Sequence, residues 1–254
     1  MAEETCIDVT HIKKRLGKTQ ALDDVSMHFA SGKMHGIIGP EGSGKTTLLR
    51  IILGLFRPDS GKVAIKEDKK TLTLGEIRNK VTYMPQQQSL YPDLSIDEHL
   101  QFFSALYQIK PADYQKRREH LLQLTGLAPY TDRAAGALSG GMYKKLGLMC
   151  ALLRSPEILL LDEPTTGVDP ISRREFWNML YELLDRNILI LLTTAYMDEA
   201  ERCSEVHLLS GGKVMDSGEP HELLKKNNVK TFDALFLKND AEAQADSNKA
   251  EKNG

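Results

Sequence analysis

One eight-residue segment limits what this chain can fold into more than any other. Residues 39–46 read GPEGSGKT, which matches the phosphate-loop pattern G-x-x-x-x-G-K-[ST]. Residues 34–38, just before it, are short and apolar like a buried strand, and residues 48–55, just after it, have helical apolar spacing. The segment therefore predicts a strand, a glycine-rich loop and a helix in succession, which is a unit of an α/β fold.

The residue types in this loop suit the binding of a polyphosphate. Glycines let the backbone turn so that successive N–H groups point at phosphate oxygens, and the following helix offers its positive N-terminus. The Lys45 ammonium would reach the β- and γ-phosphates, and the Thr46 hydroxyl would ligate Mg²⁺. The predicted phosphate-binding residues are Gly39, Pro40, Glu41, Gly42, Ser43, Gly44, Lys45, Thr46 and Thr47.

A second motif supplies carboxylates for the metal. Residues 159–163 read LLLDE, an apolar strand that ends in two acids. Asp162 would hold Mg²⁺, and Glu163 would orient and polarise the attacking water. Alone, the pattern is better explained by a strand that happens to end in solvated acids. The phosphate loop upstream favours the metal site.

The rest of the chain alternates between strand and helix patterns. Residues 6–12 and 25–29 alternate apolar and polar positions, as half-buried strands do. Residues 158–161 and 188–192 are typical of buried strands, and Asp169 caps the helix predicted between them. This alternation predicts an α/β fold with a P-loop NTPase core, in which a mainly parallel sheet is covered by helices and antiparallel strands stand at the N-terminus.

Residues 87–154 differ in character, because they hold three amphipathic helical patterns and no convincing strand. We expect them to form an all-helical subdomain inserted into the ATP-binding core, which takes residues 1–86 and 155–237. After Leu237 the chain has no aromatic residue and no aliphatic one larger than Ala. Residues 238–254 are therefore predicted to be a disordered tail or linker.

Charge and cysteine content argue against several other classes of protein. The 254 residues carry 33 Lys and Arg against 35 Asp and Glu, so no basic field favours nucleic acid. Cys6, Cys150 and Cys203 lack paired or metal-ligand spacing, which is typical of reduced cytosolic thiols. The N-terminus lacks the pattern of a secretory signal. The longest apolar runs, 158–161 and 188–192, fall short of the ~20 residues of a membrane helix, so another chain or domain would supply any span.

Further motifs carry a family resemblance. Residues 138–142 read LSGGM and resemble the signature of ATP-binding cassette (ABC) proteins, usually LSGGQ. Residues 83–86, YMPQ, are similar to the family's Q-loop, and Gln86 is chosen from three glutamines because it follows Met-Pro. Residues 162–170 are similar to the acidic strand end and D-loop. The resemblance covers residues 6–237, and its ordered motifs make it specific.

The resemblance implies a mechanism. In this family two cassettes face each other head to tail, and the signature of one caps ATP on the phosphate loop of the other. It therefore implies ATP and Mg²⁺ as ligands, ATP hydrolysis, a second cassette and an integral membrane permease as partners, and a place at the cytoplasmic face of the inner or plasma membrane. Nucleic acid is not expected. The implied roles are catalysis by Glu163 and Gln86, metal binding by Thr46, Gln86 and Asp162, and further nucleotide contacts by Leu16, Ser139, Gly140, Gly141 and Asp169.

Further sequence details of these motifs indicate a subgroup within the ABC family. Residues 90–95, Met142 and residues 165–169 look like the drug-resistance class of ABC exporters. Residues 194–201 are similar to the first cassette of a bacterial group that carries two cassettes in one chain. Such cassettes usually finish near residues 232–237, so the tail is expected to be a linker from a longer protein.

The main departure from the family pattern follows the second buried strand. The family usually has a histidine there that contacts the γ-phosphate, whereas this chain has Ala195. A methyl group cannot donate a hydrogen bond, so we hypothesise that this chain's own site hydrolyses slowly while ATP binding and clamping persist. The partner's site, capped by LSGGM, would stay active. The alternatives are that Glu163 alone suffices or that Tyr196 substitutes.

A second departure concerns the adenine. The family commonly places an aromatic residue before Gly17, where this chain has Leu16. Arg15 could stack on the base through its guanidinium plane instead. Selectivity for the base is therefore open, and GTP stays a candidate ligand.

Two other functions compete with an exporter subunit. A regulatory clamp with little hydrolysis is favoured slightly by Ala195 and disfavoured by Glu163. A soluble ABC ATPase acting on ribosomes or DNA is disfavoured by the single cassette and the lack of a basic patch. Trp177, His99 and His207 are interpreted as structural or surface residues rather than ligands.

Overall fold

The structure is a computed structural model that describes residues 5–68, 70–87 and 89–238. The chain divides into two compact units, each of which mixes strands and helices. Unit 1 takes the described parts of Met1–Cys6, Ala30–Gly32 and Ile65–Leu192. Unit 2 takes the described parts of Ile7–Phe29, Lys33–Ala64 and Thr193–Gly254. The mixed α/β class predicted from the sequence is confirmed.

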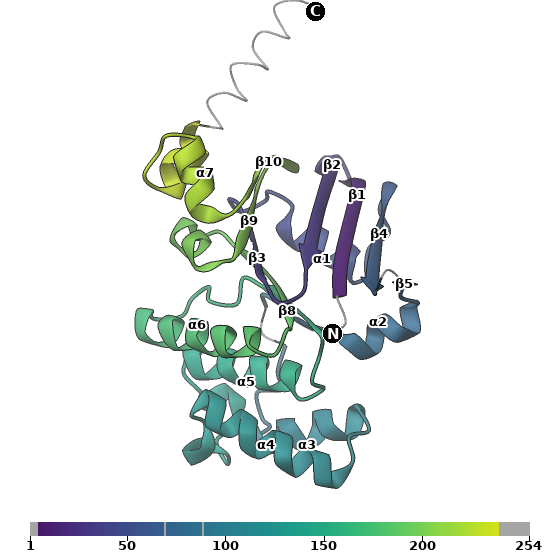
Figure 1. Ribbon diagram of the computed structural model, residues 1–254. Helices are drawn as coiled ribbons and strands as arrows, with labels where there is room; N and C mark the ends of the chain where they lie inside the picture. Colours follow the sequence, from purple (N-terminus) through teal and green to yellow (C-terminus); the bar gives the residue numbers. More distant parts are fainter. Residues whose placement is uncertain (1–4, 69, 88, 239–254) are drawn as a thin grey trace, which may run out of the picture. The chain divides into compact units, whose positions relative to one another are not determined.

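The first strands of unit 2 form a hairpin (Figure 1). β1 (Thr5–Leu16) and β2 (Thr19–Ala30) are neighbours joined by two residues, a connection short enough only for antiparallel strands. β4 (Ser60–Glu67) lies on the other side of β1. Alternate residues of β1 are buried, because successive side chains of a strand point to opposite faces.

A second group of strands in unit 2 contains β3 (Met34–Ile38), in which all five residues are buried. It pairs in parallel with β9 (Glu205–Ser210), and β10 (Lys213–Gly218) returns antiparallel to β9 through left-handed Gly211 and Gly212. The hairpin predicted around these glycines is therefore confirmed. The helical elements beside these strands are the 3₁₀ helix η3 (Met197–Arg202), which contacts β3, and α7 (Pro220–Lys226), which contacts β10.

The strands of unit 1 include two that are completely buried. β6 (Val81–Met84) pairs in parallel with β7 (Ile158–Asp162), and β7 is followed in the sheet by β8 (Leu189–Thr194), whose last two residues belong to unit 2. Every residue of β7 and β8 is buried, as expected for strands covered on both faces. The short β5 (Lys70–Thr71) pairs antiparallel with the end of β4.

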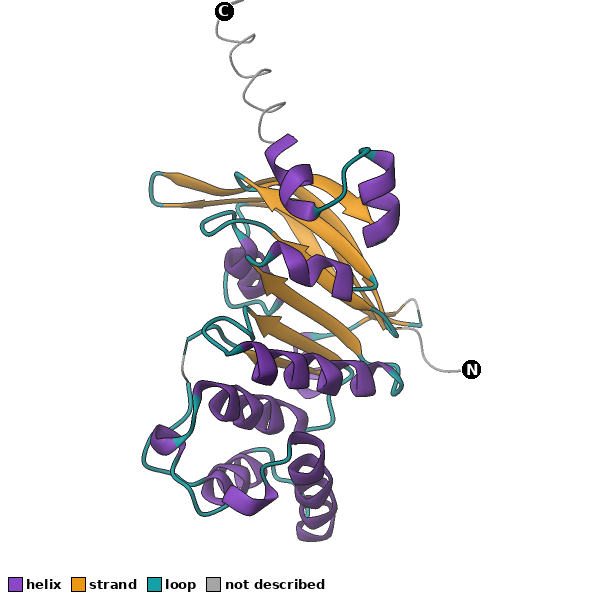
Figure 2. Cartoon of the chain, turned by 90° about the vertical axis from the view of Figure 1, so that its left-hand side faces the viewer, coloured by secondary structure: helices purple, strands orange, loops and turns teal. Residues whose placement is uncertain are grey.

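Helices dominate the middle of unit 1. α3 (Ile96–Leu106) and α4 (Pro111–Thr125) both contact α5 (Gly140–Leu152), which also packs against β6 and α6 (Pro170–Leu184). Figure 2 shows only helices and loops around α3 to α5, including the 3₁₀ turns η1 (Ala128–Tyr130) and η2 (Ala135–Ala137). The boundaries proposed for a helical subdomain, 87–154, stay a prediction.

Trp177 lies on α6 with no exposed surface, beside Phe176 and Leu180, which are also buried. Its interpretation as a packing residue is confirmed. Across the described parts of the chain, no helix combines the length and the apolar composition needed to cross a membrane. The predicted tail, apart from its first residue Lys238, lies outside the described residues.

Several short elements differ from the sequence expectations. α1 (Lys45–Ile52) ends before residue 55, because Gly54 adopts the left-handed conformation with φ of 71°. α2 (Leu74–Lys80), the strand β6 after it, and α7 were not predicted. Each of these elements is seven residues or fewer, which is too short to show a periodicity above its surroundings.

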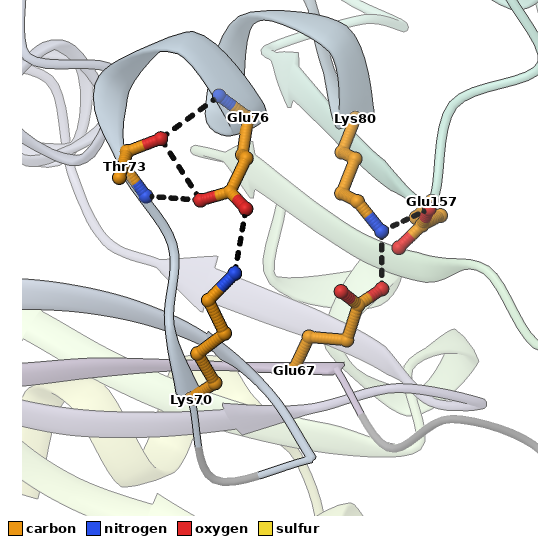
Figure 3. Close-up of polar contacts among 6 residues, drawn as sticks. All are labelled: Glu67, Lys70, Thr73, Glu76, Lys80 and Glu157. Carbon is orange, nitrogen blue, oxygen red and sulfur yellow. Dashed lines mark hydrogen bonds and ion pairs between the residues drawn. The ribbon is translucent and has the colours of Figure 1, made fainter.

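An ion-pair cluster ties α2 to the strands on either side of it in unit 1 (Figure 3). Thr73 and Glu76 form a reciprocal capping box at the start of the helix, and Lys70 pairs with Glu76 at 2.7 Å. At the other end, Lys80 pairs with Glu67 on β4 and, at 2.7 Å, with Glu157 before β7. These contacts raise the pKa of Lys80.

We predict that Lys80→Met lowers the free energy of unfolding by about 1–2 kcal/mol, because Lys80 is only 22% exposed and joins two carboxylates. Lys70→Met is the matched control, since Lys70 is 69% exposed and pairs with Glu76, so its loss should leave the free energy of unfolding almost unchanged. Urea unfolding followed by circular dichroism measures both. If the two variants lost the same free energy of unfolding, burial of the Lys80 ion pairs would not contribute to stability.

Candidate nucleotide-binding site

The phosphate loop of unit 2 spans the gap between β3 and α1. Gly42 has φ of 75°, and Gly44, which caps α1, has φ of 106°. Residues with a Cβ rarely adopt these values, so glycine is required at Gly44 in particular. The loop thus turns its backbone in the way that a phosphate-binding loop requires.

Neighbouring backbone leaves no room for a side chain at Gly39 or at Gly44. A Cβ on Gly39 would lie 2.0 Å from the carbonyl oxygen of Leu209, and one on Gly44 would lie 2.4 Å from that of Ala21. The N–H of Gly39 donates to the carbonyl oxygen of Thr194 at 3.2 Å, so the end of β8 lies against the start of the loop. These contacts hold the loop in one shape before any ligand arrives.

The loop also carries donors suited to an anion. Lys45 is 4% exposed, and its ammonium donates to the carbonyl oxygens of Gly39 and Pro40 at 2.7 and 2.9 Å. Ser43 is 2% exposed, and its hydroxyl lacks a hydrogen-bond partner among the described residues. Thr46 and Thr47 are half-buried in the first turn of α1. A buried hydroxyl without a partner is costly, so it marks a place for a ligand oxygen.

Ala195 and Leu16 belong to the same unit as the phosphate loop. Ala195 directly follows Thr194, the residue that accepts from Gly39, so it lies beside the start of the loop. The N–H of Tyr196 donates to the Thr194 hydroxyl at 3.0 Å. Leu16 is 43% exposed at the end of β1. The guanidinium of Arg15 donates to Gln20 at 3.4 Å.

In unit 1, the two predicted acids stand at the end of β7. Asp162 is completely buried, and the Tyr83 hydroxyl donates to its Oδ2 at 3.0 Å. Glu163 is 6% exposed and has φ of 45°, an unusual conformation for a residue that is not glycine. Backbone strain of this kind persists only where the surroundings enforce it, and it is concentrated at functional sites.

Gln86 and Glu163, which are 77 residues apart, meet in this unit. The Gln86 amide donates to Oε2 of Glu163 at 2.9 Å, and the Thr166 hydroxyl donates to the same oxygen at 3.2 Å. The Lys144 ammonium donates to the Gln86 carbonyl oxygen at 3.2 Å, and burial lowers the pKa of Lys144. The bonds from Gln86 and Thr166 fix the direction of the Glu163 carboxylate.

Sequence reasoning assigned no role to Tyr83, Thr166 or Lys144. Tyr83 and Thr166 fall inside the motifs that contain Gln86 and Glu163. Their places in these motifs are a sequence signal that could have identified them. The residues they contact could not be predicted, because those contacts depend on the pairing of β6 with β7 and on the turn after β7.

The signature turn and the D-loop residue Asp169 also meet in unit 1. Ser139 caps α5 and accepts from Met142 N–H at 3.3 Å, while Asp169 caps α6. A Cβ on Gly141 would lie 2.4 Å from Cβ of Ser172, so glycine lets the two helix starts pack together. Backbone N–H groups from Ser172 and Ile171 lower the pKa of Asp169. Ser139 and Gly140 stay exposed.

We predict that Gly44→Ala weakens binding of an ATP analogue at least about tenfold, because the methyl group meets the Ala21 carbonyl and distorts the loop. Gly126→Ala is the control: Gly126 is also left-handed, with φ of 68°, but has open space around its Cβ position. It should cost about 1 kcal/mol of stability and leave binding unchanged. Fluorescence titration of a labelled nucleotide tests both, and an unaffected Gly44→Ala protein would contradict the rigid-loop argument.

Comparison with known proteins identifies the family of this chain. The model of the ABC transporter family matches residues 22–166. The probable multidrug ABC transporter ATP-binding protein YbhF of Escherichia coli is 43% identical over 209 residues, which are 82% of this chain and 36% of that protein. The Nod factor export ATP-binding protein I of Ralstonia nicotianae is 37% identical over 219 residues, which cover 86% of this chain and 68% of the relative. The chain thus spans about a third of the length of the E. coli relative.

Solved structures of ABC ATP-binding proteins match the fold of this chain. One described as the ATP-binding subunit of an ABC transporter superposes with a TM-score of 0.79 and 28% identity, and the match covers 92% of this chain and 98% of that one. The sequence prediction of an ABC ATPase domain is confirmed at the level of the family. The chain belongs to the ABC transporter family, as one of its ATP-binding domains.

Proposed function

We propose that this chain binds MgATP and couples its binding and hydrolysis to a membrane permease that exports a substrate. The observation that carries the proposal is the preformed phosphate loop. Its left-handed glycines, its buried Lys45 and its Ser43 hydroxyl, which has no hydrogen-bond partner in the described part of the chain, suit a polyphosphate. Export is supported by relatives whose names refer to multidrug transport and Nod factor export. The permease would choose the substrate and would hold the chain at the cytoplasmic face of the membrane.

The proposed roles follow from the chemistry of each group. The phosphate loop holds the phosphates, with Lys45 reaching the terminal ones. Thr46, Asp162 and Gln86 would hold Mg²⁺, which neutralises charge on the phosphate oxygens. Glu163 polarises the attacking water, and its hydrogen bonds from Gln86 and Thr166 support that role because they fix the direction of the carboxylate.

A second cassette is part of the proposal. Ser139 and Gly140 are exposed at the start of α5, a helix of 13 residues, and the N-terminus of a helix attracts anions. In the proposed dimer they cap the nucleotide bound by the other cassette, with Gly141 and Asp169 beside them. Capping by a partner would make closure of the dimer part of each catalytic cycle.

Ala195 makes slow hydrolysis at this chain's own phosphate loop part of the proposal. The bond from Gly39 N–H to Thr194 supports a place for Ala195 beside the loop, where only a methyl group is offered to the γ-phosphate. One charge-assisted hydrogen bond contributes about 1.5–3 kcal/mol. Its absence removes that stabilisation from the transition state without disturbing the parts that bind nucleotide.

We predict that Ala195→His raises steady-state MgATP turnover roughly ten- to a hundredfold, because it restores a donor to the γ-phosphate. Glu163→Gln is the inactive control, since it keeps the shape of Glu163 but removes the carboxylate. Phosphate release is the measurement. An ordinary rate in the parent chain that the histidine leaves unchanged would overturn the slow-site proposal and favour a self-sufficient cassette.

A second candidate function is an ATP-dependent clamp that regulates a partner with little hydrolysis. Ala195 favours it, whereas the oriented Glu163 favours an enzyme. The two functions differ in whether the assembled complex of this chain and its partners turns ATP over. Nucleotide binding without turnover in that complex would favour the clamp.

We predict that Leu16→Tyr tightens ATP binding by about tenfold, because an aromatic ring stacks on a base with about 1–3 kcal/mol. Leu16 is 43% exposed, so the larger ring fits without disturbing the core. Competition between ATP and GTP for a labelled nucleotide measures the effect in the parent and the variant. Unchanged affinity for both nucleotides would show that position 16 does not contact the base.

A further inference from the structure

Three side chains that can bind a metal meet on β3 and β9 within unit 2. The parallel register places His35 opposite Glu205, and His207 follows Glu205 by two residues, on the same face of the sheet. One ligand atom from each of the three lies within 4.8 Å of the other two. Nδ1 of His35 is 3.9 Å from Oε2 of Glu205. None of these residues belongs to the nucleotide-binding machinery described above.

The two histidines are held in place by packing. His35 is 1% exposed and His207 is 3% exposed. Their rings stack with centroids 5.9 Å apart, and Phe29 packs edge-on against both, at 5.3 and 5.0 Å. Glu205 is 29% exposed, so it marks the side from which an ion would enter. The cluster is therefore rigid on one side and open to solvent on the other.

The ring of His207 is oriented like that of a metal ligand. Its Nδ1 lies 3.0 Å from the hydroxyl of Ser217, which faces it from β10. Its Nε2 is buried and lacks a hydrogen-bond partner among the described residues. If Nδ1–H donates to Ser217, Nε2 presents a lone pair, and this is how outer hydrogen bonds usually fix metal-binding histidines. Burial lowers the pKa of His207 to about 3, which keeps the ring neutral at pH 7.

We propose that His35, Glu205 and His207 bind a divalent transition-metal cation of the zinc class, with water as the fourth ligand. Two imidazoles and one carboxylate are a ligand set typical of Zn²⁺ sites that keep an open position. Closing the three ligand atoms around an ion requires small side-chain rotations, which the exposed edge at Glu205 permits. From the sequence alone His207 is a structural residue, and its neighbours in space change that interpretation.

Lys33 provides an internal competitor for the cation. Its ammonium pairs with Oε2 of Glu205 at 3.4 Å, and its side chain is 52% exposed, so it can turn into solvent when an ion binds the carboxylate. The bound cation and the Lys33 ammonium would therefore compete for the same oxygen of Glu205. Removal of the Lys33 charge should strengthen metal binding, whereas a purely structural histidine pair would be indifferent to it.

The test is calorimetric titration of the tag-free chain with ZnCl₂. We expect one ion per chain. Glu205→Gln should weaken binding about 10- to 100-fold, as loss of a ligand or its support does, and Lys33→Met should tighten it several-fold, about three- to tenfold. The matched control is His11→Ala, because the His11 side chain is 72% exposed and its ring bonds to Asp24, outside the proposed ligand set. It should leave the affinity unchanged.

His207→Gln removes the buried ligand, and thermal melting identifies whether each variant is folded. Co²⁺ in place of Zn²⁺ adds an absorption spectrum that reports nitrogen and oxygen ligands directly. The proposal is overturned if Zn²⁺ shows no saturable binding, if folded Glu205→Gln binds as tightly as the parent, or if His11→Ala abolishes binding. Opposite effects of Glu205→Gln and Lys33→Met would support it, whatever the chain's rate of ATP hydrolysis.

Discussion

The crowding of backbone around the phosphate loop is the constraint on which the nucleotide-binding unit depends. Carbonyl groups of Leu209 and Ala21 occupy the space that side chains at Gly39 and Gly44 would need. The turn between β9 and β10 also takes part, since Gly212 N–H donates to the Ser43 carbonyl. The loop keeps its shape because three segments far apart in the chain close around it. An anion-binding surface is thus ready before the ligand arrives, which reduces the cost of ordering on binding.

The acidic residues of the other unit are organised by a different principle. Glu163 holds a left-handed backbone without being glycine, and hydrogen bonds from Gln86 and Thr166 fix its carboxylate. In the proposed function, nucleotide binding and hydrolysis would therefore rest on separate sets of contacts. Ala195 would then cost the γ-phosphate one donor while the phosphate loop keeps its shape.

Strand β3 connects two features of unit 2 that differ in chemistry. Its carboxyl end leads into the phosphate loop. Near its amino end, pairing with β9 places His35 opposite Glu205. The same burial that makes β3 a rigid support also keeps the two histidines away from water. Imidazole binds metals in its neutral form, and burial favours that form for His207.

Spacing along the chain determined much of this protein: the phosphate loop between a strand and a helix, the buried acidic strand, the helical middle region and the family. Those features are local, so periodicity and turn chemistry reveal them. The tertiary structure alone decided which groups meet. Tyr83 reaches Asp162, Gln86 reaches Glu163, and His35 lies opposite Glu205 only because β6 pairs with β7 and β3 with β9. Strand register depends on packing between distant segments, and no single stretch of sequence encodes it.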